Sequence, residues 1–102
     1  MGVRDRIDFD QVRIACQRNA LAICQRVLPG GRVVGGEYEV RNPKRLDRNP
    51  GSFQINVRTG RWSDFATGDS GGDVISLVAY LFDISQLEAA RHLSSLLSLS
   101  SE

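Results

Sequence analysis

Basic side chains are concentrated in one short part of the chain. Residues 41–61 hold six of them against a single acid, Asp47, which gives this segment a net charge of +5. The rest of the 102-residue chain carries seven basic residues and eleven acids, and its net charge is −4. Lysine and arginine side chains neutralise phosphates in a salt-dependent and sequence-tolerant way. The six candidate phosphate contacts are Arg41, Lys44, Arg45, Arg48, Arg58 and Arg61.

Aromatic and amide side chains lie within this segment and just after it. Trp62, Phe65 and Phe53 could stack on unpaired bases if they are exposed. Gln54 and Asn56 could form hydrogen bonds with base edges. Each group also has a plainer interpretation. Phe53 belongs to an alternating apolar run and is expected in the core, Trp62 could seal a hydrophobic seam, and the arginines could form a solvated surface.

Candidate catalytic groups are few. Asp64, Asp69 and Asp73 could be proposed as a Mg²⁺ site, but they lie on a loop and its borders, whereas phosphoryl chemistry needs carboxylates held on fixed elements. The glycine-rich loop 68–72 precedes a helix, where free N–H groups could bind phosphate, but this loop carries acid and no lysine. The lone histidine, His92, has no nearby partner of catalytic type. The sequence therefore predicts no catalytic residues and no cofactor.

The two cysteines indicate a reducing compartment. Cys16 and Cys24 are eight residues apart in a helical segment, a separation of about 12 Å along a helix axis, which is too long for a disulfide. We expect both to be buried and reduced, which is typical of a cytoplasmic protein. The first residues show no signal peptide, and no apolar run approaches the roughly 20 residues of a membrane span.

Three helices and a small sheet are expected to position these groups. The first helix spans 8–28: Asp8 can cap it, Gln11 follows three residues later, and Pro29 ends it. Alternation of apolar and polar residues predicts a meander of about three strands over 37–65, with a tight turn at Thr59 and Gly60.

Two further helices follow, over 73–82 and 86–97, the second with a capping box formed by Ser85 and Glu88. The fold class is α+β, and we expect one domain over 1–102: an N-terminal helix, a small antiparallel sheet and two C-terminal helices.

The order of motifs in 38–97 resembles the zinc-ribbon domain at the N-terminus of bacterial and phage DNA primases. In that family a Cys-Pro-x-His pair follows a strand, a Pro-Ser-Phe strand comes next, and an aromatic, a Cys-x-x-Cys pair and a Gly-Gly-Asp loop follow. The matching segments here are Asn42-Pro43-Lys44-Arg45, Pro50-Gly51-Ser52-Phe53, Gly60-Arg61-Trp62, Asp64-Phe65-Ala66-Thr67-Gly68 and Gly71-Gly72-Asp73-Val74-Ile75.

All four zinc-ligand positions differ from the family pattern. They hold Asn42, Arg45, Asp64 and Thr67, and residues 38–73 contain neither cysteine nor histidine. A structural zinc site needs cysteine or histidine donors, and arginine keeps its proton and cannot be a ligand. We therefore predict that no zinc is bound, and we hypothesise that Arg45 pairs with Asp64 where the metal would tie two loops together. Similar zinc-less forms occur in primase-like proteins of phages, plasmids and integrated elements.

The resemblance implies a non-catalytic domain that binds single-stranded template DNA, with the chemistry on another domain or chain. In the family the sheet face contacts the template, and the expected contacts here are the six basic residues with Trp62 and Gln54. Expected partners are single-stranded DNA and a primase catalytic domain or a helicase. The alternative is a protein-interaction or regulatory module that kept the ribbon fold without DNA binding.

Overall fold

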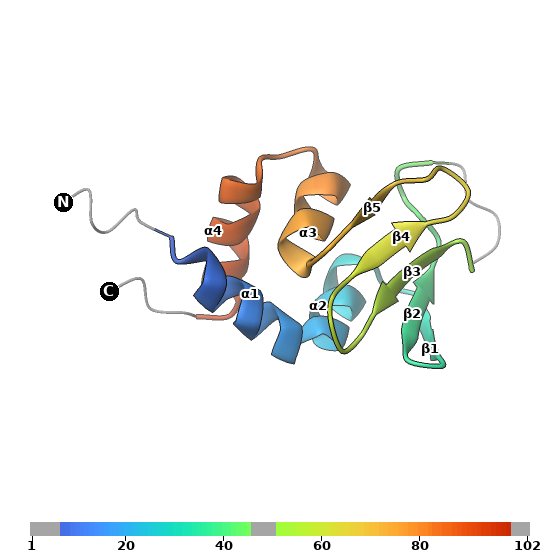
Figure 1. The fold of residues 1–102 in the computed structure, drawn as a ribbon, viewed down its shortest axis with the longest axis horizontal. Helices are drawn as coiled ribbons and strands as arrows, with labels where there is room; N and C mark the ends of the chain where they lie inside the picture. Colours follow the sequence, from blue (N-terminus) through green and yellow to red (C-terminus); the bar gives the residue numbers. More distant parts are fainter. Residues whose placement is uncertain (1–6, 46–50, 99–102) are drawn as a thin grey trace.

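The computed structural model describes residues 7–45 and 51–98. Figure 1 shows the helices gathered on one side and the sheet on the other. The helices are α1 (Phe9–Arg18), α2 (Ala20–Val27), α3 (Val74–Phe82) and α4 (Gln86–Leu96). The strands are β1 (Arg32–Val34), β2 (Glu37–Val40), β3 (Phe53–Asn56), β4 (Trp62–Asp64) and β5 (Ser70–Gly71). The α+β class is confirmed.

The sheet is a single antiparallel meander in the order β1-β2-β3-β4-β5. The expected three strands are β2, β3 and β4, and two short edge strands add to them, so the prediction of about three strands was wrong. In β1 all three residues are exposed, so no alternation of burial marks this strand. β5 has two residues, a serine and a glycine, and no apolar side chain.

The single helix expected over 8–28 is two helices in the structure, because the helix is interrupted at Asn19. The Asn19 backbone leaves the helical region (φ −120°, ψ 22°), and its side-chain amide donates to the Ala15 carbonyl at 2.7 Å. Asparagine side chains compete in this way for backbone hydrogen bonds, which disfavours them inside helices. Asp8 caps α1 through the Gln11 N–H, as expected.

The two C-terminal helices begin at capping boxes. Asp73 accepts from the Ser76 N–H at 2.8 Å, and Ser85 accepts from the Glu88 N–H at 3.1 Å, with the reciprocal contact present in each box. These contacts satisfy N–H groups that have no partner within the helix. The observed bounds of α3 and α4 lie within one residue of those predicted.

The core has two adjoining parts. One lies among the four helices and includes Val12, Cys16 and Leu93. The other lies between the inner face of the sheet and α2 and α3, and it includes Tyr38, Phe53, Ile55, Trp62 and Leu77. Both cysteines, Cys16 and Cys24, are buried and form no disulfide. Within the described residues, no helix has the length and apolar content that crossing a membrane requires.

Candidate nucleic-acid interface

A buried carboxylate lies at the end of the sheet where β2 leaves and β4 ends. Asp64 is fully buried and accepts from Arg45 Nε at 2.8 Å, Arg45 Nη2 at 3.2 Å and Asn42 Nδ2 at 2.8 Å. The Ala66 backbone N–H donates at 2.9 Å to Oδ1, the oxygen that also accepts from Arg45 Nη2. The hypothesised pairing of Arg45 with Asp64 is therefore confirmed.

These partners keep Asp64 ionised in spite of its burial. Burial alone raises the pKa of a carboxyl group, because desolvation penalises the charged form. Hydrogen bonds from Arg45, Asn42 and the Ala66 N–H, together with the positive charge of Arg45, outweigh that effect and lower the pKa of Asp64 to about 2. A charged, bidentate arginine contact of this kind is among the stronger polar interactions in proteins.

The cluster extends to helix α3 through Tyr80. Its hydroxyl accepts from Asn42 Nδ2 at 2.9 Å and donates to Asp69 Oδ2 at 2.8 Å. Lys44 lies over the Tyr80 ring, 5.1 Å from its centroid, and forms an ion pair with Asp83 at the end of α3. Side-chain contacts thus join the loop after β2, the end of β4 and helix α3.

Three of the four positions that hold zinc in the resembling family meet in this cluster. Asn42, Arg45 and Asp64 are in mutual contact, whereas Thr67 is exposed and its hydroxyl accepts from the Asp69 N–H. A guanidinium group lies against the one carboxylate, so the donors do not fit a zinc ion. Across residues 7–45 and 51–98 there is no group of three or more His, Cys, Asp or Glu side chains placed to hold a metal.

The three aspartates considered as a Mg²⁺ site do not converge. Asp64 is bound by Arg45, Asp69 accepts from Tyr80, and Asp73 caps α3. This alternative was wrong, because each carboxylate already serves a different structural contact. His92 is exposed on α4, as expected of a surface residue.

The outer face of the sheet, which points away from the helices, forms a regular grid. One row across the strands runs Arg32, Glu39, Gln54, Ser63 and Ser70, and the next runs Val34, Glu37, Asn56 and Arg61. Alternation along the strands places these side chains on the face opposite the core residues.

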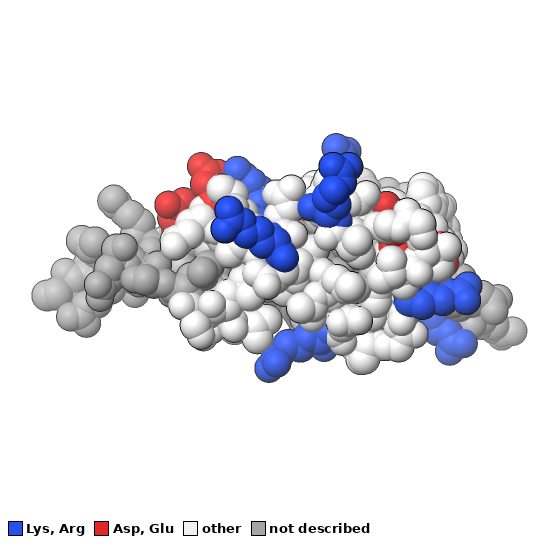
Figure 2. Space-filling model, turned by 90° about the horizontal axis from the view of Figure 1, so that it is seen from below, with Lys and Arg blue, Asp and Glu red and all other residues white. Residues whose placement is uncertain are grey.

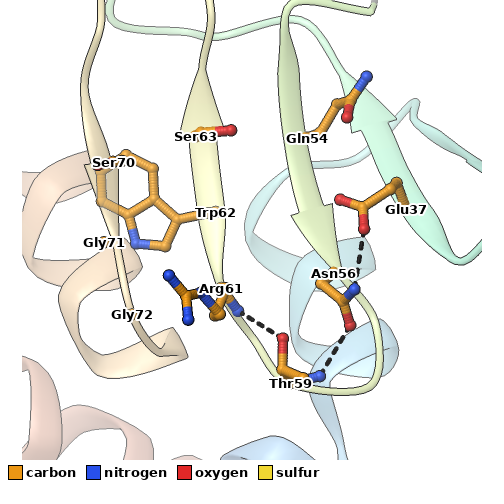
Figure 3. Close-up of a pocket in the computed structure, with 10 residues that line it drawn as sticks. All are labelled: Glu37, Gln54, Asn56, Thr59, Arg61, Trp62, Ser63, Ser70, Gly71 and Gly72. Carbon is orange, nitrogen blue, oxygen red and sulfur yellow. Dashed lines mark hydrogen bonds between the residues drawn. The ribbon is translucent and has the colours of Figure 1, made fainter.

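A hollow of about 580 Å³ opens on this outer face (Figure 3). Arg61 and Ser63 of the β3–β4 hairpin, Ser70 on β5, and Glu37 and Asn56 on β2 and β3 contribute to its lining. The Asn56 amide donates to Glu37 Oε2 at 2.9 Å, and its oxygen accepts from the N–H groups of Arg58 and Thr59. The hollow is therefore polar, and hydrogen bonds fix the side chains of Asn56 and Glu37 in its lining.

The amide of Gln54 is also occupied. Its Nε2 donates to Glu39 Oε2 at 3.2 Å and to the Gly51 carbonyl at 2.8 Å. Gln54 was expected to form hydrogen bonds with base edges. The structure leaves the acceptor, Oε1, for that task.

The structure does not bring the five described candidates among the six basic residues into one patch. Arg41 lies one residue beyond β2, whereas Arg58 and Arg61 lie at the hairpin at the opposite end of the sheet. Lys44 and Arg45 are bound to Asp83 and Asp64. Figure 2 shows basic side chains separated by uncharged surface on the face in view. Arg48 lies outside the described residues.

Trp62 does not meet the condition set for base stacking, which was exposure on the sheet. The residue is 5% exposed, its ring centroid lies 4.7 Å from that of Tyr80, and its Nε1 donates to Ser76 Oγ at 3.0 Å. It seals the core, because its β4 position faces the helices. Phe53 is also fully buried.

Of the three aromatic residues considered for base stacking, Phe65 is the exposed one, with 72% of its surface accessible. It follows the inward-facing Asp64, so the alternation along β4 would have identified it as an outer-face residue. Its N–H donates to the Ser52 carbonyl at 2.9 Å, which continues the β3–β4 pairing at the end of the sheet near Arg41. The same alternation also identifies Glu37, Ser63 and Ser70, which were not among the expected site residues.

The fold is shared with a solved primase, and this likeness supports a primase-related domain. The solved protein is the Aquifex aeolicus primase, in a crystal structure of its zinc-binding and RNA polymerase domains. The two chains are 27% identical with a TM-score of 0.75, and the match covers 91% of this chain and 22% of that chain. No protein-family model matches the chain, and the search of curated proteins also gave no match.

Proposed function

We propose that this chain is a non-catalytic domain that binds single-stranded template DNA within a primase-like replication protein of a phage, plasmid or conjugative element. The observation that carries the proposal is the structural match over 91% of the chain to a bacterial primase. In this proposal the cluster around Asp64 replaces the zinc ion, so the template-binding surface is held without a metal.

The outer face of the sheet is the proposed binding surface. Phe65 and Arg41 lie at one end of it, and Arg58 and Arg61 lie at the other. Phe65 lies four residue steps along the strand from Arg61, a distance of about 13 Å. A strand of a few nucleotides could stack one base on Phe65 and place phosphates on the arginines.

Lys44 and Arg45 have a structural role in this proposal. Both side chains are about three-quarters buried and bound to carboxylates, so their charges are largely neutralised within the protein. Phosphate contact therefore depends on Arg41, Arg58 and Arg61.

Any polymerising chemistry belongs to another domain or chain. Asp64, Asp69 and Asp73 each serve a separate structural contact. The proposed partners are single-stranded DNA and a primase catalytic domain or helicase. No cofactor is part of the proposal.

Fluorescence anisotropy with a labelled single strand of mixed sequence tests the proposal. We expect binding that weakens as salt rises, since each neutralised phosphate releases counterions. Arg58→Ala with Arg61→Ala is expected to weaken binding and to reduce the salt dependence. The matched control, Arg13→Ala with Arg26→Ala, removes the same charge from α1 and α2 and should change little. Equal losses in the two double variants, or no binding at all, would overturn the proposal.

A protein-interaction role is the second candidate, and one feature favours it. Val27, Val78, Phe82, Leu93 and Leu96 contribute to an apolar groove of about 330 Å³ between α2, α3 and α4. Phe82 is 55% exposed beside it. This candidate gains support if Phe82→Asp abolishes association with a co-expressed catalytic domain while the sheet shows no affinity for DNA.

A further inference from the structure

The hollow on the outer face presents the acceptors of Glu37 and Gln54 to an incoming ligand, beside the hydroxyl groups of Ser63 and Ser70. The donors of Asn56 and Gln54 are directed at Glu37, Glu39 and a backbone carbonyl. Among the described residues, no hydrogen bond reaches Glu37 Oε1 or Gln54 Oε1. Gln54 therefore uses both N–H groups of its amide and Asn56 uses one of its two, while one oxygen of Glu37 and the oxygen of Gln54 stay available as acceptors in the lining.

One positive and one negative side chain line this hollow. Arg61 supplies the positive charge and Glu37 the negative charge of the lining. Figure 3 shows the Arg61 side chain directed toward Gly72, and Glu37 beside Asn56. A phosphate would be attracted to Arg61 and repelled by Glu37, so the two charges orient a nucleotide with its base toward Glu37.

We infer that the hollow selects, within a bound single strand, cytosine over thymine through the exocyclic amino group, with Glu37 as the specificity-determining residue. This inference rests on the proposed function, because it assumes that the sheet binds a single strand. The cytosine N4 amino group donates hydrogen bonds, and acidic side chains accept from it in protein–DNA interfaces. Thymine carries the O4 carbonyl at that position, which would place an acceptor against a carboxylate.

The physical basis is the cost of an unmatched polar contact. A carboxylate that leaves water for a base edge loses solvation, and a hydrogen bond from the cytosine amino group compensates for that loss. Thymine offers no such compensation at O4. One charge-assisted hydrogen bond of this kind corresponds to at least a roughly tenfold difference in affinity.

Anisotropy titrations with labelled oligo-dC and oligo-dT of equal length measure the selection directly. Both are pyrimidine homopolymers, so they differ mainly in the groups on the base. We expect oligo-dC to bind roughly tenfold more tightly than oligo-dT. In Glu37→Gln the new amide can still accept from Asn56 and can offer an NH₂ group to thymine O4, so the dC to dT ratio should fall toward one.

Asp10→Asn is the matched control, because it removes one negative charge from the exposed start of α1 and leaves the sheet unchanged. It should retain the preference for oligo-dC. Equal affinities of the unaltered protein for the two strands would overturn the inference and leave the proposed function standing. A preference that survives in Glu37→Gln would also overturn it, whereas absence of binding to either strand would overturn the proposed function itself.

Discussion

Arg45 Nε lies 2.8 Å from Asp64 Oδ2, and this contact joins the loop after β2 to the end of β4. Asp64 is fully buried, and Asn42 and the Ala66 N–H complete its coordination by hydrogen bonds. Arg45 and Asp64 stand at two of the positions that the sequence resemblance assigns to zinc ligands, and their charged pair connects these two segments. The stability of the fold should therefore depend on this pair and not on a metal.

Removing the cation should destabilise the domain strongly. Arg45→Met leaves the Asp64 carboxylate buried without its ion-pair partner, a change that typically costs about 3–5 kcal/mol. Urea unfolding measures the free energy of unfolding, and the addition of Asp64→Asn should recover part of the loss, because it removes the unpaired charge. Arg13→Met, which breaks an exposed pair with Asp10, is the control and should change little. A loss in Arg45→Met no larger than in the control would contradict this role.

The stability of the domain should fall steeply at acid pH. The pKa of Asp64 is lowered from an ordinary value of 3.8 to about 2, so the ionised carboxylate stabilises the fold at pH values above about 4. That contribution is lost as pH falls from about 4 toward 2, and the linkage amounts to roughly 2–3 kcal/mol. Urea unfolding between these pH values should reveal the loss in the unaltered protein and a much smaller one in Asp64→Asn. Parallel pH profiles for the two proteins would show that Asp64 is not responsible.

The close approach of β5 to Trp62 should make Gly71 sensitive to substitution. A Cβ atom at Gly71 would lie 2.4 Å from both Trp62 Nε1 and Ser76 Oγ. Gly71→Ala should therefore disturb the hydrogen bond between these two side chains and cost about 1–3 kcal/mol. Gly72→Ala is the matched control, because a Cβ atom there meets nothing within 4 Å. Thermal unfolding followed by tryptophan fluorescence compares the two, and equal midpoints would rule out the expected clash.

The exposed Phe65 ring should contribute to binding and not to stability. Phe65→Ala is expected to leave the unfolding midpoint within error and to weaken binding of a single strand by roughly 5- to 100-fold, the effect of one stacked base. Phe82→Ala removes another exposed ring, on α3, and should leave DNA binding unchanged. A loss of stability without a loss of affinity would assign Phe65 to packing.

The sequence allowed the prediction of those elements whose pattern of burial is regular. β2, β3 and β4 alternate between buried and partly exposed residues, and α3 and α4 begin at caps that can be read from Asp73 and Ser85. β1 and β5 could not be predicted, since their pairing depends on neighbouring strands and not on their own side chains. The break at Asn19 was missed because the apolar periodicity continues across it.

The candidate site was predictable in part. The pairing of Arg45 with Asp64 followed from the resemblance, because the two residues replace ligands of one metal. The distribution of the basic residues could not be predicted from their density along the chain, since Arg41 and Arg61 leave the sheet at opposite ends. Trp62 was expected among the DNA contacts but is buried, because it packs on Tyr80, far along the chain. Phe65, which was also considered for stacking, is exposed.

An NMR titration of the ¹⁵N-labelled protein with a short single strand, at low and at high salt, tests the central claim most directly. We expect amide shifts at Glu37, Gln54, Arg61, Ser63 and Phe65 that weaken at high salt, while α1 and α4 stay unchanged. Shifts confined to the apolar groove between α2, α3 and α4, or no shifts at either salt concentration, would contradict the claim that this sheet binds single-stranded DNA.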